Sequence, residues 1–203
     1  MADTDRIARL RISPAGIGPE IRRRVGAPLT ASLKGVHGAI QAAMGRAGQH
    51  PFAVHVGRKV YGIPDPAWDF GRRVTNAAGV KLAALVARGI DRLSYVYDLG
   101  DDWRHTVTIE AVEPPAAAQP YPRFVDGARR CPPEDVGGTE GYHEFLEAIG
   151  RPGHPEHRRM LEWYGGPYDP DDLDLPLIQR RIGVLADRRA AGQAAYAKSR
   201  RKG

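Results

Sequence analysis

Two acidic stretches that also contain glycines carry the side chains whose types and spacing could bind a metal or take part in catalysis. They run from Tyr95 to His105 and from Cys131 to Tyr142. Carboxylates at this density repel one another unless cations or helix N-termini offset their charge. If the two stretches meet in space, they could hold Mg²⁺ or Mn²⁺ for phosphoryl-transfer or nuclease-like chemistry, with a histidine as ligand or base. The candidate metal ligands are Asp98, Asp101, Asp102, His105, Glu134 and Asp135.

The same side chains also have a structural interpretation. Asp-x-Gly-Asp, at residues 98–101, forms a good hairpin turn by itself. Glu134 and Asp135 could cap a helix that starts near Gly141, or they could lie in solvent. His105 is either a hydrogen-bonded histidine at the edge of the core or a site residue beside the acidic turn. The sequence leaves both interpretations open.

Aromatic residues accompany both acidic stretches. Exposed aromatic side chains within acidic loops are typical of an interface with a protein or a basic ligand. Three residues are candidates for such a recognition surface: Tyr97, Trp103 and Tyr142. The alternative is that these rings pack in the core.

Charge is unevenly distributed along the chain. Residues 1–60 carry 10 Lys and Arg against 3 Asp and Glu, residues 61–179 carry 12 against 20, and residues 180–203 carry 8 against 1. Basic ends suggest an acidic partner such as nucleic acid, bound through phosphate contacts that do not depend on base sequence. A solvated helix face and a frayed tail would give the same pattern. The candidate phosphate contacts are Arg188, Arg189, Lys198, Arg200, Arg201 and Lys202.

The elements that must position these residues follow from apolar periodicity. Alternation predicts strands at about residues 8–12, 21–25, 52–56, 60–61, 93–97 and 103–110. Helical spacing predicts helices at about 33–44, 79–88, 145–149 and 155–164, and a last helix from about 176. Residues 62–74 are expected to form a loop, and 114–122 a Pro/Ala-rich connector. Because strands and helices do not alternate regularly, an α+β domain of antiparallel strands or hairpins packed with several helices is the predicted class.

Length and composition set the domain organisation. With 203 residues and 42% hydrophobic content, the chain can bury a normal core. We expect one domain over residues 1–187 and a flexible, basic, helical tail over 188–203. No apolar run has the length of a membrane span, and the N-terminus does not resemble a signal peptide. These features predict a cytoplasmic protein without a membrane partner, and the single Cys131 excludes an intramolecular disulfide.

Several motifs together resemble one family. They are the Pro-x-Ile-Arg-Arg segment at 19–23, the helix at 33–44 followed by Gly45, His50 before a strand, the run 97–105 and the run 131–138. In this combination the chain resembles the family named for the third open reading frame of an Ri plasmid. This resemblance implies an α+β fold and a kinship to insertion-element passenger proteins that carry a resolvase-like label.

The chain departs from the family pattern in three places. The family usually has a Trp where this chain has Arg22, another Trp where it has Arg46, and a second Cys where it has Val136. The last change leaves Cys131 alone, which weakens any role for a cysteine pair in metal binding.

These observations lead to two functional hypotheses. The first is a non-enzymatic binding module associated with plasmid or mobile DNA, with nucleic acid bound through the basic ends or a protein bound through the aromatic loops. The alternative is a metal-dependent phosphoryl-transfer or nuclease-like enzyme that uses the acidic loops, with a divalent metal as its cofactor.

Overall fold

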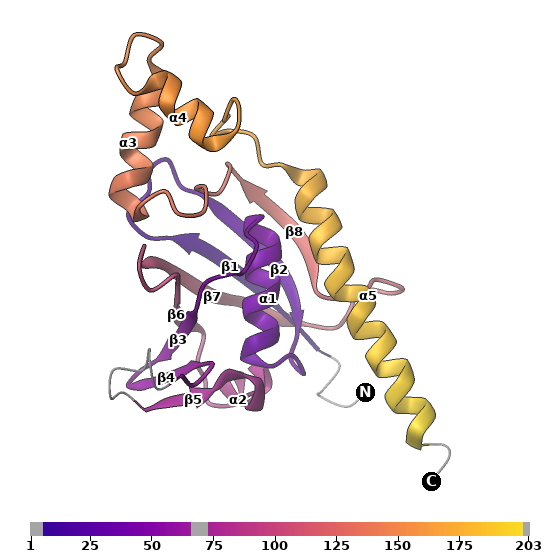
Figure 1. Ribbon diagram of the computed structural model, residues 1–203. Helices are drawn as coiled ribbons and strands as arrows, with labels where there is room; N and C mark the ends of the chain where they lie inside the picture. The colour runs from indigo at the N-terminus through magenta and orange to yellow at the C-terminus, as the bar shows by residue number, and fades with distance from the viewer. Residues whose placement is uncertain (1–5, 66–72, 201–203) are drawn as a thin grey trace.

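The protein is built on one large, mostly antiparallel β-sheet with helices packed against it (Figure 1). The computed structural model describes residues 6–65 and 73–200. Within them the sheet has eight strands in the order β5-β4-β3-β6-β7-β1-β2-β8, and only the β4–β5 pair is parallel. The predicted α+β class is therefore confirmed.

The elements follow the predicted order. The strands are β1 (Ile7–Pro14), β2 (Arg22–Pro28), β3 (Phe52–Val56), β4 (Lys59–Gly62), β5 (Val74–Asn76), β6 (Arg92–Tyr97), β7 (Trp103–Glu113) and β8 (Arg123–Ala128). The helices are α1 (Leu33–Met44), the 3₁₀ turn η2 (Ala77–Gly79), α2 (Leu82–Val86), α3 (Gly138–Gly150), α4 (His157–Tyr164) and α5 (Leu175–Arg200). Two strands were not predicted, β5 and β8, and the helix expected at 79–88 is shorter.

The long strands β1 and β7 are neighbours in the inner part of the sheet, and each buries alternate side chains over much of its length. Ala8, Leu10 and Ile12 of β1 are all at most 1% exposed. On β7 the side chains of Trp103, His105 and Val107 are buried, while those between them are exposed. This period of two directs one face of the sheet toward the helices and gives the core its main surface.

Helix α1 packs on the core face of the sheet, and the segment that follows it contains Arg46 and His50. Its N-terminus is capped by Ser32, whose Oγ accepts from the Gly35 amide at 3.1 Å. Its C-terminus ends at Gly45, which adopts a left-handed φ of 76°. The segment from Arg46 to His50 follows directly, so the end of α1 fixes where these two side chains lie.

Helix α5 runs along the outside of the molecule and packs on α1 and β8 (Figure 1). Its buried side chains are Ile178, Ile182 and Ala186, all in the first half. The boundary expected after residue 187 falls inside this helix, so residues 188–200 continue α5 without a break. Among the described residues, no helix combines the length and apolar character needed to cross a bilayer.

Candidate functional site

The two acidic stretches meet in space, and two glycines make the contact close. The Gly137 amide donates to Asp101 Oδ2 at 3.2 Å. Gly138 lies so near that a Cβ on it would be 2.5 Å from the Asp101 carbonyl oxygen, and its φ is +67°. A side chain at Gly138 would therefore collide with backbone, and only glycine permits this approach.

The first loop is a tight turn held by its own aspartate. Asp98 has a left-handed φ of 58° and is buried. Its Oδ1 accepts from the amides of Gly100 at 3.0 Å and Asp101 at 3.3 Å. The interpretation of this stretch as a hairpin turn is thus correct for Asp98 Oδ1. The second oxygen, Oδ2, is directed out of the turn.

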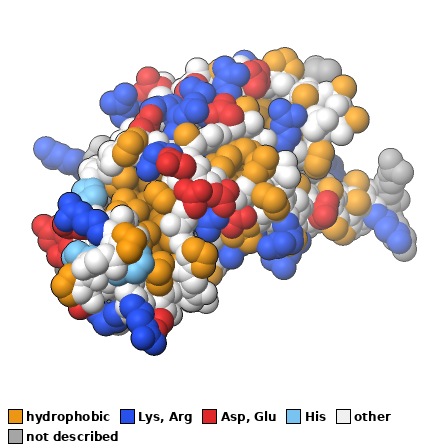
Figure 2. All heavy atoms as spheres, turned by 90° about the horizontal axis from the view of Figure 1, so that it is seen from above, with side chains coloured by type: hydrophobic (Ala, Val, Ile, Leu, Met, Phe, Trp, Pro, Cys, Tyr) orange, Lys and Arg blue, Asp and Glu red, His pale blue; other side chains and the backbone are white. Residues whose placement is uncertain are grey.

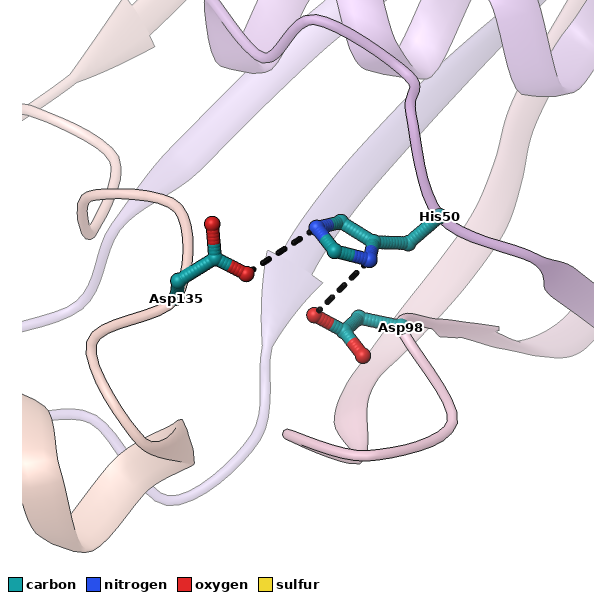
Figure 3. A group of neighbouring side chains, drawn as sticks. All are labelled: His50, Asp98 and Asp135. Carbon is teal, nitrogen blue, oxygen red and sulfur yellow. Dashed lines mark ion pairs between the residues drawn. The ribbon is translucent and has the colours of Figure 1, made fainter.

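His50 lies between Asp98 and the second loop (Figure 3). Its Nδ1 is 3.6 Å from Asp98 Oδ2, and its Nε2 is 3.1 Å from Asp135 Oδ1. The three residues each offer one ligand atom, and these atoms all lie within 4.8 Å of one another. They come from three separate segments: the linker after α1, the end of β6 and the loop before α3. The predicted ligands Asp98 and Asp135 are thereby brought together.

Cationic partners are scarce at this point of the molecule. Within the part of the chain that the structure describes, no Lys or Arg forms an ion pair with Asp98, Asp101 or Asp135. The Asp98 carboxylate accepts from two backbone amides, and the Asp135 side chain is 69% exposed to solvent. Among the described residues, His50 is the side chain that lies within ion-pair distance of both carboxylates.

Glu134 has a structural role that the sequence did not suggest. Its Oε1 accepts from the Ala47 amide at 3.1 Å and from the Tyr97 hydroxyl at 3.1 Å. Its Oε2 is 3.5 Å from Arg46 Nη1. Glu134 thus ties the second loop to the end of α1 and to β6, instead of joining the His50 group or capping α3. Burial, followed by the nearby Glu134 charge, raises the pKa of Tyr97 to about 12.

The proposed ligands His105 and Asp102 lie elsewhere. His105 is 2% exposed, and its Nδ1 is 3.0 Å from the Trp103 carbonyl oxygen. Burial lowers its pKa to about 4. The prediction of a site histidine here is wrong, because the alternation of β7 turns His105 into the core. Asp102 pairs with Arg104 at 2.7 Å on the surface and does not join the group.

The three aromatic residues proposed as a recognition surface are core residues. Tyr97, Trp103 and Tyr142 are at most 1% exposed. The Tyr142 hydroxyl lies 3.0 Å from the Tyr168 hydroxyl, and the Trp103 ring packs 4.7 Å from the Arg46 guanidinium carbon. The expectation of an exposed interface is therefore corrected in favour of core packing.

The basic residues divide into two groups. Four arginines of β1 and β2 are offset by neighbouring acids, in the pairs Arg9–Glu110, Arg11–Glu20, Arg22–Asp126 and Arg24–Glu110, whereas Arg23 is buried. Figure 2 shows basic and acidic side chains next to each other on the face seen there. Arg188, Lys198 and Arg200 are exposed on α5, whereas Arg189 donates to Thr30 Oγ1 at 2.6 Å. Arg201 and Lys202 lie outside the described residues.

A surface groove of about 900 Å³ lies beside His50. Its walls include His37, Phe52 and Leu99, and charged side chains such as Lys34 lie along it. The His37 ring stacks on Phe52 with centroids 3.8 Å apart, and burial lowers the pKa of His37 to about 4. Of the three residues of the group, His50 is the one that lines this groove.

Sequence reasoning missed the contribution of His50 to the site. In the sequence, His50 was noted only as a family motif position before a strand. Pairing of β3 with β6 places Phe52 opposite Tyr97, and the Asp98 amide donates to the Pro51 carbonyl at 2.9 Å. Correct pairing of these two strands would have placed residue 50 beside residue 98.

Comparison with known proteins agrees with this fold. Residues 6–177 match the family described as plasmid pRiA4b ORF-3-like protein. The chain belongs to this family. It is similar to the uncharacterised protein y4hQ of Sinorhizobium fredii (strain NBRC 101917 / NGR234), at 35% identity over 89% of this chain and 92% of that protein. It is also similar to the crystal structure of MM3350, a protein of unknown function from Methanosarcina mazei Go1. That match has a TM-score of 0.77 and 28% identity over 87% of this chain and 96% of the other.

Proposed function

We propose that this member of the pRiA4b ORF-3-like family is a binding protein that holds a divalent cation where its two acidic loops meet. The observation that carries the proposal is the position of His50 between Asp98 and Asp135, with one ligand atom from each within 4.8 Å of the others. A cation between them would balance both carboxylates, with which no Lys or Arg of the described residues forms an ion pair.

The ligand set suits a small divalent ion. One imidazole nitrogen and two carboxylate oxygens are donors that Mn²⁺ and Zn²⁺ accept readily, and Mg²⁺ is commonly bound through one or two carboxylates. Asp98 is oriented in advance, because the amides of Gly100 and Asp101 hold its Oδ1 and leave Oδ2 for the ion. Such outer contacts are typical of metal sites.

Three protein ligands would leave coordination positions of the ion open. Because His50 also lines the groove, a molecule bound in the groove could occupy one of these positions. An anionic ligand such as a phosphate could complete the coordination shell of the ion. In the phosphoryl-transfer or nuclease-like alternative, an ion-bound water would act as the nucleophile. Both uses require the cation first, so cation binding is the step to test.

Isothermal titration of the full chain with Mg²⁺, Mn²⁺, Zn²⁺ and Ca²⁺ tests the proposal. Asp98→Asn and Asp135→Asn each remove one charge while keeping a residue type that accepts a left-handed φ. Asp102→Asn is the matched control, since it has the same chemistry and a φ of 52° but lies outside the group. We expect each ligand variant to lose at least about tenfold in affinity, by analogy with effects at metal sites, and the control to bind normally.

Two results would refute a cation site. One is the absence of binding of any of the four ions by the wild-type chain. The other is wild-type affinity in both Asp98→Asn and Asp135→Asn when circular dichroism shows that they are folded. Release of phosphate from a nitrophenyl phosphate ester by the loaded protein, lost in Asp135→Asn, would separate the enzymatic alternative from simple binding.

A second candidate function, nucleic-acid binding, is favoured by the exposed basic end of α5. The helix carries Lys198 and Arg200 beyond its last buried residue, Ala186. For duplex DNA, each lost phosphate contact lowers the slope of log affinity against log salt by about 0.9. We expect Lys198→Gln/Arg200→Gln to weaken DNA binding and reduce this slope, and Arg158→Gln on α4 to change neither. Unchanged affinity and slope in the α5 variant would refute this role for the helix.

A further inference from the structure

A separate cavity of about 310 Å³ contains the only cysteine of the chain. It lies where the end of α1 meets the segment 130–134, and the end of α4 and the start of α5 complete its lining. Cys131 is 8% exposed. Four of the residues that line it are Arg23, Arg46, Cys131 and Glu134. We call this space the cysteine cavity.

Arg46 is a buried cation with incomplete hydrogen bonding. Its side chain is 2% exposed, and its Nε donates to Cys131 Sγ at 3.3 Å. Nη1 lies 3.5 Å from Glu134 Oε2, which is too far for a good hydrogen bond. Neither Nη1 nor Nη2 has a hydrogen-bond acceptor within the described residues, and Glu134 Oε2 has no donor. The guanidinium instead packs over the Tyr97 and Trp103 rings at 5.1 and 4.7 Å.

Arg23 adds a second buried cation at the same wall. It is 1% exposed and donates only to backbone carbonyls, those of Arg22, Ala43 and Ala128. Burial lowers its pKa, and the nearby Cys131 side chain opposes that shift. Unlike Arg46, it has no carboxylate partner among the residues described.

The charges around the sulfur do not balance. Arg130 and Asp174, which also line the cavity, pair with each other, and this leaves two buried guanidinium groups, those of Arg23 and Arg46, with the carboxylate of Glu134. A buried charge without a counter-charge is costly. Negative charge or acceptor oxygen at Cys131 would correct this imbalance and would supply the acceptor that the Nη groups of Arg46 lack.

We propose that Cys131 is a modification site that hydroperoxides oxidise to a sulfenic acid, with Arg46 holding the new oxygen. The sulfur attacks the terminal oxygen of the peroxide, an S–O bond forms and the O–O bond breaks. The thiol proton leaves with the second oxygen, as water from hydrogen peroxide or as an alcohol from an organic hydroperoxide, so the thiol is oxidised by two electrons and the hydroperoxide is reduced.

The absence of a second cysteine limits the further reactions of the sulfenic acid. Because Cys131 is the only cysteine, no second thiol of the same chain can form a disulfide with it. A small thiol can condense with the sulfenic acid, forming an S–S bond and releasing water. Until then, the cavity shields the product and Arg46 stabilises it.

The first experiment compares one thiol in two environments. The reduced full-length chain is treated with hydrogen peroxide, native or in denaturing urea, and the sulfenic acid at Cys131 is trapped with dimedone and quantified by mass spectrometry. We expect the native thiol to react at least about tenfold faster than the unfolded one, because the unpartnered Nη groups of Arg46 can stabilise the oxygen as the S–O bond forms. If burial made Cys131 inert, the native thiol would react more slowly, and a native rate equal to or below the unfolded rate overturns the proposal.

Variants then assign the role of Arg46. Arg46→Met removes the charge and the donors, and Arg46→Lys retains the charge alone. The expected order of sulfenic acid yield is wild type, then Lys, then Met. If folded Arg46→Met matches the wild type, Arg46 does not assist the reaction. If both variants fail to fold, the comparison of native and unfolded wild type still decides whether Cys131 is activated.

Discussion

Replacement of Gly138 by alanine tests the contact between the two acidic loops. Gly138 has a left-handed φ, which costs an L-residue about 1–2 kcal/mol. Its new Cβ would also lie 2.5 Å from the Asp101 carbonyl oxygen, a distance that real Cβ atoms essentially never show. Overpacking against atoms that cannot rotate away costs about 1–3 kcal/mol. The two effects together predict a loss of about 2–5 kcal/mol of unfolding free energy.

The neighbouring Gly137 provides a matched control. Its φ of +90° is also left-handed, but the nearest atom to its added Cβ would be Gly141 Cα at an ordinary 3.6 Å. Gly137→Ala therefore carries the backbone cost alone, about 1–2 kcal/mol. Urea denaturation followed by circular dichroism measures both variants, and the difference between them isolates the contact with Asp101.

The same substitution connects stability to the proposed cation site. If the collision pushes the loops apart, Asp135 moves away from Asp98 and His50, so cation affinity falls in Gly138→Ala more than in Gly137→Ala. Equal stability losses in the two variants would show that the loops do not press together at this point. Normal cation binding in a destabilised Gly138→Ala would show that the contact does not position the ligands.

Two further predictions concern the core. His37 and His105 have pKa values near 4, below the ordinary 6.5, so between these pH values the unfolded chain binds more protons. Stability should therefore fall as pH falls through this window, by up to about 1.4 kcal/mol per pH unit for each histidine; urea midpoints that stay constant from pH 7 to pH 5 would contradict this. Tyr95→Phe removes the hydroxyl that lies 2.8 Å from His37 Nδ1 and 2.7 Å from Gln41 Nε2. It should cost about 1–3 kcal/mol in the same assay, whereas Tyr196→Phe on the surface should cost nothing measurable.

Local patterns predicted the elements that bury alternate or helically spaced residues. β1, β7 and α1 have such patterns, and the structure contains each of them close to its expected place. β8 was missed because Phe124 and Val125 are adjacent and Gly127 interrupts the stretch, so no alternation is visible. That strand is defined by its pairing with β2, in which Val25 lies opposite Phe124. Pairing of this kind is a tertiary property that a local window does not contain.

The candidate site was partly predictable for the same reason. Acidic density pointed to Asp98 and Asp135, which the structure places beside His50, but it could not separate them from Asp102, which pairs with Arg104. His105 was chosen because it is close in sequence. The histidine that meets the carboxylates, His50, is 48 positions from Asp98 and reaches it only through the pairing of β3 with β6. Non-local register therefore decided which residues form the site.

The structure also explains why the family motifs are long and yet uninformative about chemistry. Several of their side chains hold the fold together: Glu134 accepts from the Tyr97 hydroxyl and from the Ala47 backbone amide, and the Trp103 ring covers Arg46. Arg46 occupies a position where the family resemblance implies a Trp, and its flat guanidinium packs against the rings as an aromatic side chain would. Such residues report how the loops are joined. The carboxylate oxygens that this joining leaves beside His50 are Asp98 Oδ2 and Asp135 Oδ1, and for that reason a search for function should begin with a titration of divalent cations.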